Sequence, residues 1–279
     1  MNRSTSRQHE PMVITSLQND RVKAIRALDM RKERKATGLF VAEGASIIFT
    51  ARENGWMPQT LVARENTLSA GVVTELSRWV MQAGGNVMAV SEAVLAKLSS
   101  KENPQSVLGV FKQRHAPLPD PRSLGTGDVV LVLEEVRDPG NLGTIMRTVD
   151  AVGAKAVILV GQCCDPWSRE CVRATMGSIF AVPISRASHD GYLEWSKAWP
   201  GDVVATHLAG TEDFRMAHYR APSLLMMGSE GPGLSDQMAA VATRKVKIPM
   251  AGRLDSLNLA VATALVLYQM RGSNLKLGS

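Results

Sequence analysis

The first 113 residues alternate short apolar runs with stretches in which apolar residues recur every three or four positions. The apolar runs predict strands near residues 39–42, 60–63, 86–90 and 107–111, and the periodic stretches predict helices near residues 44–54, 72–83 and 91–98. A basic stretch that Ser16 or Asn19 can cap predicts one more helix over residues 21–35. We therefore expect a small α/β domain over residues 36–113, preceded by a basic helical extension over residues 1–35.

The same alternation restarts after a run rich in Pro and Gly, HAPLPDPRSLGTG, which predicts a linker over residues 114–127. Continuous apolar runs then predict buried parallel strands near residues 129–133, 156–160, 179–182, 203–206, 224–228 and 245–248. Helices are expected between them near residues 142–152, 169–175, 191–198, 236–241 and 257–270. The pattern predicts a second α/β domain over residues 128–279, with helices on both faces of a parallel sheet.

Composition narrows the class of protein. The chain has 279 residues, of which 45% are hydrophobic and 21% charged, which excludes disorder over its whole length. No apolar run approaches the length of a membrane span, and the polar first ten residues do not resemble a secretory signal. The cysteines, Cys163, Cys164 and Cys171, are odd in number and lack metal-site spacing. We expect reduced thiols, no bound metal and a cytoplasmic location.

The positive charge is concentrated at the N-terminus. The net charge is +6, and residues 1–40 hold nine Lys or Arg against four Asp or Glu. A stretch of this kind attracts phosphate backbones without reading sequence. A solvated helix face is the alternative interpretation, and charge alone does not choose between the two.

Three segments follow predicted strands at the sheet edge where open α/β sheets bind ligands. In the first, Asn141 can cap the next helix and Arg147 can point back toward the strand ends; a plain capped turn with an exposed arginine is the alternative. The second holds Glu230 in a glycine-rich loop whose spacing is not that of a dinucleotide site. In the third, Ser256 is expected to cap the last helix, where the amide of Asn258 needs a polar partner.

Each segment is ambiguous alone, but together they resemble one family closely. The order DPGNLGTIMRT, LMMGSEGPGLS and IPMAGRLDSLNLAVATALVLY resembles the three motifs of the SpoU/TrmH group of SPOUT RNA methyltransferases, over about residues 129–271. The N-terminal sequences ITSLQNDRVKAIRAL and FVAEGASIIFTA more loosely resemble the L30e-like substrate-binding domain that such enzymes often carry.

The resemblance implies a fold and a reaction. The fold is a SPOUT domain with a deep trefoil knot, an exception to the rule against knotted chains. The reaction is methyl transfer from S-adenosylmethionine to a ribose 2′-hydroxyl of structured RNA. Members of the family are usually homodimers through the C-terminal domain. Ribosomal RNA is the first expectation for the substrate and tRNA the second. A non-catalytic RNA-binding protein is the competing hypothesis, and a dinucleotide-dependent oxidoreductase is disfavoured because no GxGxxG follows a first strand.

The resemblance also implies residue roles. Arg147 would contact the target phosphate and assist removal of the hydroxyl proton, and because an arginine is almost always charged, we favour a phosphate clamp over a base. The residues that would orient Arg147 and the ribose are Asn141, Glu230, Ser256 and Asn258. The residues that would bind the cofactor are Gly228, Ile248 and Leu257, with Met226 and Met250 adding to its apolar wall.

Overall fold

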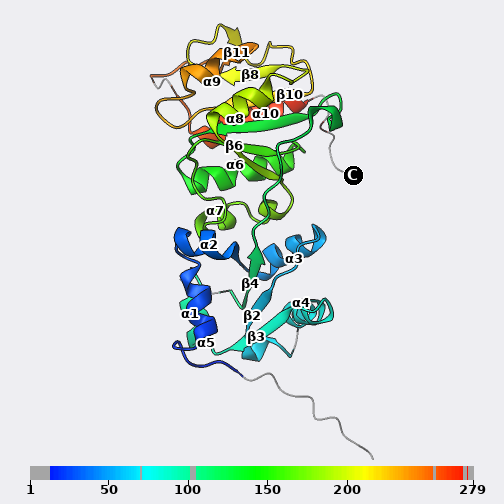
Figure 1. The fold of residues 1–279 in the computed structure, drawn as a ribbon, viewed down its shortest axis with the longest axis vertical. Coiled ribbons are helices and arrows are strands. Elements are labelled where there is room, and N and C mark those ends of the chain that lie inside the picture. The colour runs from blue at the N-terminus through cyan, green and yellow to red at the C-terminus, as the bar shows by residue number, and fades with distance from the viewer. Residues whose placement is uncertain (1–12, 70, 101–104, 254–255, 273–274, 276–279) are drawn as a thin grey trace, which may run out of the picture. The chain divides into compact units, whose positions relative to one another are not determined.

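A computed structural model describes residues 13–69, 71–100, 105–253, 256–272 and 275. The chain divides into two compact units after Gln113 (Figure 1). Each unit is an α/β layer, as the sequence predicts.

The N-terminal unit is built on a four-stranded sheet. Its strands are β1 (Leu39–Glu43), β2 (Thr60–Arg64), β3 (Asn86–Val90) and β4 (Val107–Lys112), in the order β1-β4-β2-β3. Strands β2 and β3 are parallel, and β4 is antiparallel to both of its neighbours. The helices are α1 (Asp20–Ala27), α2 (Arg31–Thr37), α3 (Ala45–Glu53), α4 (Gly71–Gln82) and α5 (Glu92–Leu98). In Figure 1, α1 and α5 lie together on one side of the sheet, with α3 and α4 on the other.

The single helix predicted over residues 21–35 is two helices, α1 and α2. Arg34 explains the break, because its buried side chain donates to the carbonyls of Leu28 and Asp29 at 2.8 and 2.9 Å. Such bonds satisfy carbonyls that the end of α1 leaves without a helical partner. Helix α1 also contributes Val22 and Ile25 to the hydrophobic core. This part of the predicted extension is therefore packed into the N-terminal unit.

The C-terminal unit contains a seven-stranded sheet in the order β7-β6-β5-β10-β8-β11-β9, in which neighbouring strands are parallel. The strands are β5 (Val129–Glu134), β6 (Val157–Val160), β7 (Ile184–Ala187), β8 (Val203–Thr206), β9 (Glu212–Asp213), β10 (Ser223–Met227) and β11 (Arg244–Lys247). Strand β10 lies between β5 and β8, so the chain returns to the middle of the sheet after strands have formed on both sides. The knot itself stays a prediction.

Helices cover both faces of this sheet. Helices α8 (His189–Ser196) and α9 (Asp236–Ala240) bury Tyr192 and Met238 against the core residues of one face. Helices α6 (Pro139–Ala151), α7 (Arg169–Ala174) and α10 (Leu259–Arg271) pack together on the other face, where α10 contacts β5 and β10. The strand predicted at residues 179–182 is wrong: a 3-10 helix covers Ser178–Phe180, and β7 begins at Ile184.

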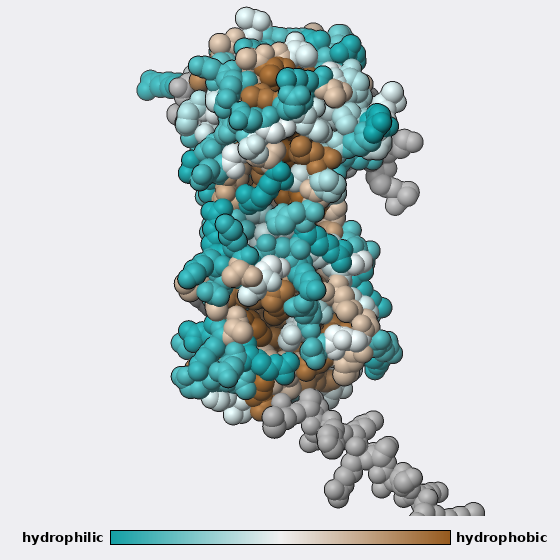
Figure 2. Space-filling model, in the orientation of Figure 1, coloured by the Kyte–Doolittle hydropathy of each residue, from teal (hydrophilic) through white to brown (hydrophobic). Residues whose placement is uncertain are grey.

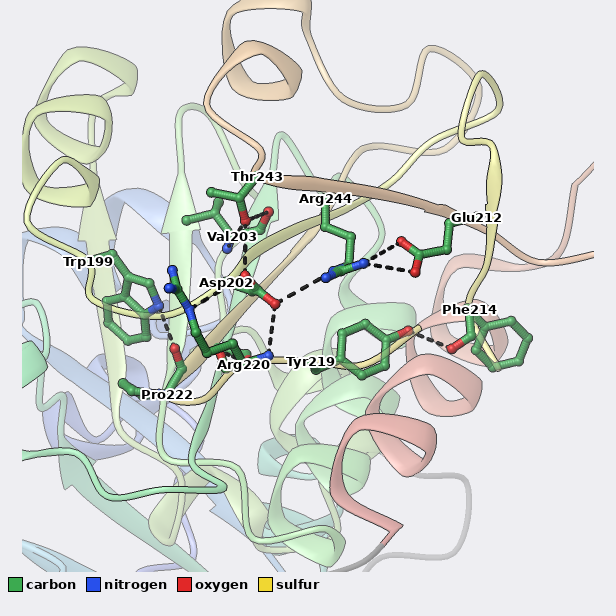
Figure 3. Close-up of polar contacts among 11 residues, drawn as sticks. Trp199, Asp202, Val203, Glu212, Phe214, Tyr219, Arg220, Pro222, Thr243 and Arg244 are labelled. Atoms are coloured by element: carbon green, nitrogen blue, oxygen red, sulfur yellow. Dashed lines mark hydrogen bonds and ion pairs between the residues drawn. The ribbon is translucent and has the colours of Figure 1, made fainter. Parts of the chain in front are cut away.

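A polar network closes the edge of the sheet where β8, β10 and β11 begin (Figure 3). Asp202 accepts a hydrogen bond from the Arg220 amide at 2.8 Å and lies 3.5 Å from the Arg244 Nε atom. Arg244 also donates to both carboxylate oxygens of Glu212, at 2.7 and 2.8 Å, which raises its pKa further. Tyr219 donates to the Phe214 carbonyl at 2.6 Å. These contacts hold the segment between β9 and β10 at the amino ends of the strands. The loops discussed below leave from the carboxyl ends.

The visible surface is mostly hydrophilic, with apolar residues in separate patches (Figure 2). Within the described part of the chain, no helix has the length and apolar character needed to cross a membrane.

Candidate active site

Three loops leave the sheet at the carboxyl ends of its central strands. They follow β5, β10 and β11, which lie within four neighbouring positions of the sheet. Because all three strands are parallel, their loops emerge on the same edge. The three motifs singled out in the sequence are therefore brought to one region of the C-terminal unit.

Three site residues, one from each loop, form a hydrogen-bonded chain. The Asn258 amide nitrogen donates to the Asn141 side-chain oxygen at 3.0 Å, and the Asn141 amide nitrogen donates to the Glu230 carboxylate. Asn141 and Asn258 are separated by 117 positions in the sequence. This contact between distant segments confirms that Asn258 has a polar partner, and it fixes the orientation of both amides.

Helix caps orient two members of this hydrogen-bonded chain, Asn141 and Asn258. Asp138, and not Asn141 as predicted, is the N-cap of α6, where its carboxylate accepts from the Asn141 backbone amide at 2.5 Å. The Asn141 side chain is therefore free to reach Glu230. Likewise Asn258, and not Ser256, caps α10, because its side-chain oxygen accepts from the amides of Ala260 and Val261 at 2.9 and 3.3 Å. The cap holds the Asn258 oxygen and directs its NH₂ group toward Asn141.

Glu230 lies at the tip of a tight hairpin. The Ser229 and Gly233 backbones exchange two hydrogen bonds, at 3.1 and 3.2 Å. Gly231 and Gly233 adopt φ values of +94° and +74°, which residues other than glycine rarely adopt. At Gly228 an added Cβ would lie 2.0 Å from the Gly233 carbonyl carbon. The hairpin can therefore close only if residue 228 is a glycine. From the sequence alone, Gly228 was expected only to bind the cofactor.

Arg147 and Ser256 are not part of this hydrogen-bonded chain. Both are exposed, and neither forms a hydrogen bond or ion pair with another residue that the structure describes. Arg147 lies six positions after Asn141 on α6, which places it on a different side of the helix. Its exposed guanidinium is available to an anionic ligand.

The predicted cofactor residues surround the ends of β10 and β11. Gly228 is buried directly after β10, Ile248 and Met250 are half-buried after β11, and Leu257 is 37% exposed before α10. Leu208, in the loop after β8, is 62% exposed. Large apolar side chains that are exposed together at the carboxyl ends of the strands are suited to pack against the adenine ring of S-adenosylmethionine. Met226 is fully buried in the core beside Leu234, so the structure gives it a packing role, and its contact with a cofactor stays a prediction.

Sequence reasoning missed a polar pocket beside the glycine-rich hairpin. A pocket of about 590 Å³ lies between the turn after β5 and the glycine-rich hairpin, and its lining includes Glu134, Glu135, Arg137 and Glu230. Glu135 has a left-handed φ of +54°, and the Gln162 amide and Arg137 lower the pKa of its carboxyl group. The only signal in the sequence was an acidic pair at the end of an apolar strand.

The cysteines carry no site in the described part of the chain. Burial raises the pKa of Cys164 to about 12 and also raises the pKa values of Cys163 and Cys171. Among the described residues, no group of three His, Cys, Asp or Glu side chains could hold a metal ion.

Comparison with known proteins assigns the class. The model of the SpoU rRNA Methylase family matches residues 128–268, and the model of the MRM3-like substrate binding domain matches residues 19–109. Since the first match covers half of the chain, the protein belongs to the SpoU rRNA methylase family.

Individual relatives agree over nearly the full length. The chain is 30% identical to the 23S rRNA (guanosine(2553)-2′-O)-methyltransferase of Bacillus subtilis, over 93% of this chain and 99% of the relative. An AdoMet-bound rRNA methyltransferase from Sinorhizobium meliloti is 44% identical, with a TM-score of 0.87, over 96% of this chain and 100% of that one. The AdoMet complex of AviRb from Streptomyces viridochromogenes is 29% identical, with a TM-score of 0.82, over 92% and 98% of the two chains. These matches confirm the predicted class, a methyltransferase that acts on RNA ribose 2′-hydroxyls with S-adenosylmethionine.

Proposed function

We propose that this protein methylates a ribose 2′-hydroxyl in ribosomal RNA, with the Asn141–Glu230–Asn258 chain as the centre of its site. Two of the relatives above are named as rRNA methyltransferases, the Bacillus subtilis protein for 23S rRNA, which favours rRNA over tRNA. The observation that supports the proposal is the hydrogen-bonded chain on which three loops converge. A protein that only binds RNA does not need such a chain. A substrate of this kind places the protein in the cytoplasm, with the ribosomes.

The residues divide the work of the reaction. S-adenosylmethionine supplies an activated methyl group, so the protein has to align the ribose hydroxyl and relieve it of its proton. Arg147 is an exposed guanidinium whose planar fork suits a phosphate, and it clamps the target nucleotide. Asn141, Glu230 and Asn258 hold the ribose, and Ser256 adds a hydroxyl beside the helix start. Gly228, Ile248, Met250 and Leu257 hold the cofactor.

Transfer of labelled methyl groups tests this proposal. The purified protein is incubated with labelled S-adenosylmethionine and either deproteinised 23S rRNA or bulk tRNA, both from cells that lack the gene. We expect label on 23S rRNA, in a nuclease-resistant dinucleotide that marks a 2′-O-methyl group. Label on tRNA alone would refute the substrate assignment. Absence of label on both, with intact cofactor binding, would favour the non-catalytic alternative.

We also propose that α10 forms a homodimer interface. Val261, Leu265 and Tyr268 repeat at intervals of four and three residues along α10 and are 50%, 42% and 50% exposed. Side chains at this spacing form one apolar stripe on a helix. A second copy of the chain covers this stripe, since the family resemblance implies association through this domain.

Light scattering of two variants tests the dimer. Leu265→Lys places a charge in the stripe and should convert the dimer to monomer. Met81→Lys is the matched control, because Met81 is an exposed apolar residue of the N-terminal unit, 58% accessible. A monomeric wild-type protein, or equal behaviour of both variants, would contradict this interface.

The third proposal concerns RNA binding by α1 and α2. Six of their basic side chains are exposed: Arg21, Lys23, Arg26, Arg31, Lys32 and Lys35. Deleting residues 1–35 would test this poorly, because Val22 and Ile25 belong to the core. Changing Arg26, Arg31 and Lys32 to Gln keeps the fold and should reduce the salt dependence of RNA binding by up to roughly 0.7 log units per log unit of salt for each phosphate that the variant no longer neutralises. An unchanged slope would leave these helices as a solvated face.

A further inference from the structure

A buried carboxylate lies directly beneath the glycine-rich hairpin. Glu134 is the last residue of β5, and its side chain is 3% exposed. A carboxylate in such a place is retained only if donors surround it, since burial otherwise disfavours its charge strongly. No role predicted from the sequence uses this residue.

Glu134 has three donors within hydrogen-bond distance. The Ser235 amide donates to Oε2 at 2.7 Å, and the Ser235 hydroxyl donates to Oε1 at 2.5 Å. The His189 Nε2 atom lies 2.9 Å from Oε1 and donates there when it carries the ring proton. Two of the three donors thus belong to a single residue, Ser235.

Ser235 is the point where the hairpin ends. It is the N-cap of α9, and its hydroxyl oxygen also accepts from the Met238 amide at 3.4 Å. The other end of the hairpin continues from β10 through Gly228, which has no space for a side chain. Leu234 is 5% exposed and packs into the core. The hairpin is therefore held at both ends, and Glu230 projects from its tip.

We infer that Glu134 and Ser235 are positioning residues that set the distance between Glu230 and Asn141. Asn141 lies in the first turn of α6, the helix that follows β5, so Glu134 and Asn141 belong to one strand–turn–helix unit. Through Ser235, the carboxylate binds the Glu230 hairpin to that same unit. The contact between Asn141 and Glu230 then depends on the contact between Glu134 and Ser235, which lies five residues after Glu230. This inference rests on the proposed function of Glu230 and adds residues that no motif singled out.

A double-mutant cycle in the full-length protein tests the inference. Single-turnover methyl transfer to 23S rRNA is measured for wild type, Ser235→Ala, Glu230→Ala and the double variant. If Ser235 acts through Glu230, Ser235→Ala should slow transfer at least tenfold in the wild-type background and less than twofold in the Glu230→Ala background. Ser235→Thr keeps the hydroxyl and should recover the rate to within threefold.

The matched control is Ser168→Ala. Ser168 is also an N-cap serine of the same unit, where its hydroxyl accepts from the Cys171 amide at 3.3 Å, but it does not contact the hairpin. Hydrogen exchange adds a readout independent of activity: the Ser229 and Gly233 amides should exchange at least tenfold faster in Ser235→Ala and unchanged in Ser168→Ala.

The failures are distinguishable. If Glu230→Ala transfers methyl groups at the wild-type rate, the proposed role of Glu230 is refuted, and the inference with it. If Glu230→Ala is slow but the two effects multiply, or if Ser235→Ala leaves hairpin exchange unchanged, the inference alone is overturned.

Discussion

Replacing Arg147 with alanine should separate stability from catalysis. The Arg147 side chain is exposed and forms no hydrogen bond or ion pair with the described residues, so its removal breaks no polar contact among them. We expect the free energy of unfolding to change by less than about 0.5 kcal/mol, as for an ordinary surface substitution. S-adenosylmethionine affinity should also stay unchanged, because the residues proposed to bind the cofactor follow β10 and β11.

The expected effect on the rate is much larger. Loss of one well-placed electrostatic donor costs on the order of 3 kcal/mol in the transition state. At about 1.4 kcal/mol for each factor of ten, methyl transfer should fall by at least about a hundredfold. RNA binding should weaken only modestly, with its salt dependence reduced by roughly 0.7 log units per log unit of salt, the amount for one neutralised phosphate.

Single-turnover transfer of labelled methyl groups measures this effect. Arg147→Lys keeps the charge but loses the planar fork, so little recovery would support bidentate phosphate binding, and full recovery would reduce Arg147 to a general positive charge. Arg173→Ala on α7 is the control for losing one exposed arginine and should stay within threefold of wild type. Wild-type turnover by Arg147→Ala would refute the mechanism at its centre.

Three further predictions concern the C-terminal unit. Asp202→Ala removes the carboxylate that accepts from the Arg220 amide and faces Arg244, which keeps Glu212 as its partner, so urea unfolding should show a loss of about 2 kcal/mol, with normal activity of the folded protein; a loss below about 1 kcal/mol would contradict the network. Gly228→Ala should abolish S-adenosylmethionine binding in calorimetry while circular dichroism is retained, whereas Gly125→Ala, where an added Cβ meets only Asp128 at 3.7 Å, should bind normally. With the Cys164 pKa raised to about 12, about one thiol in ten thousand is ionised at pH 8, so iodoacetamide should label the folded protein far more slowly than the urea-unfolded chain; equal rates would show that burial does not protect the thiol.

The sequence predicted the elements better than their ends. The apolar runs located most strands because a buried parallel strand has few alternatives. The caps were misassigned at Asn141 and Ser256, because Asp138 and Asn258 are equally good N-cap residues a few positions away and the sequence pattern does not choose between them. The break between α1 and α2 was missed because it depends on the burial of Arg34, and an arginine in a basic stretch is ordinarily expected at the surface.

The sequence singled out residues that the fold brings together, but it did not predict the contacts among them. Motif resemblance selected Asn141, Glu230 and Asn258, and the contacts among them required the strand order of the folded sheet. Gly228 was assigned to ligand approach, whereas the structure shows that the hairpin itself needs the space. The acidic pair that contains Glu134 did not indicate a buried carboxylate, since an acidic residue at the end of a strand is ordinarily solvated.

Mapping of 2′-O-methyl groups in total RNA tests the central claim most directly. RNA from cells with the gene, without it, and complemented with wild type or Arg147→Ala is compared at every nucleotide. We predict that one ribose methylation in 23S rRNA is lost with the gene, returns with wild type and does not return with Arg147→Ala. An unchanged methylation map after loss of the gene, or a missing methyl group confined to tRNA, would contradict the assignment.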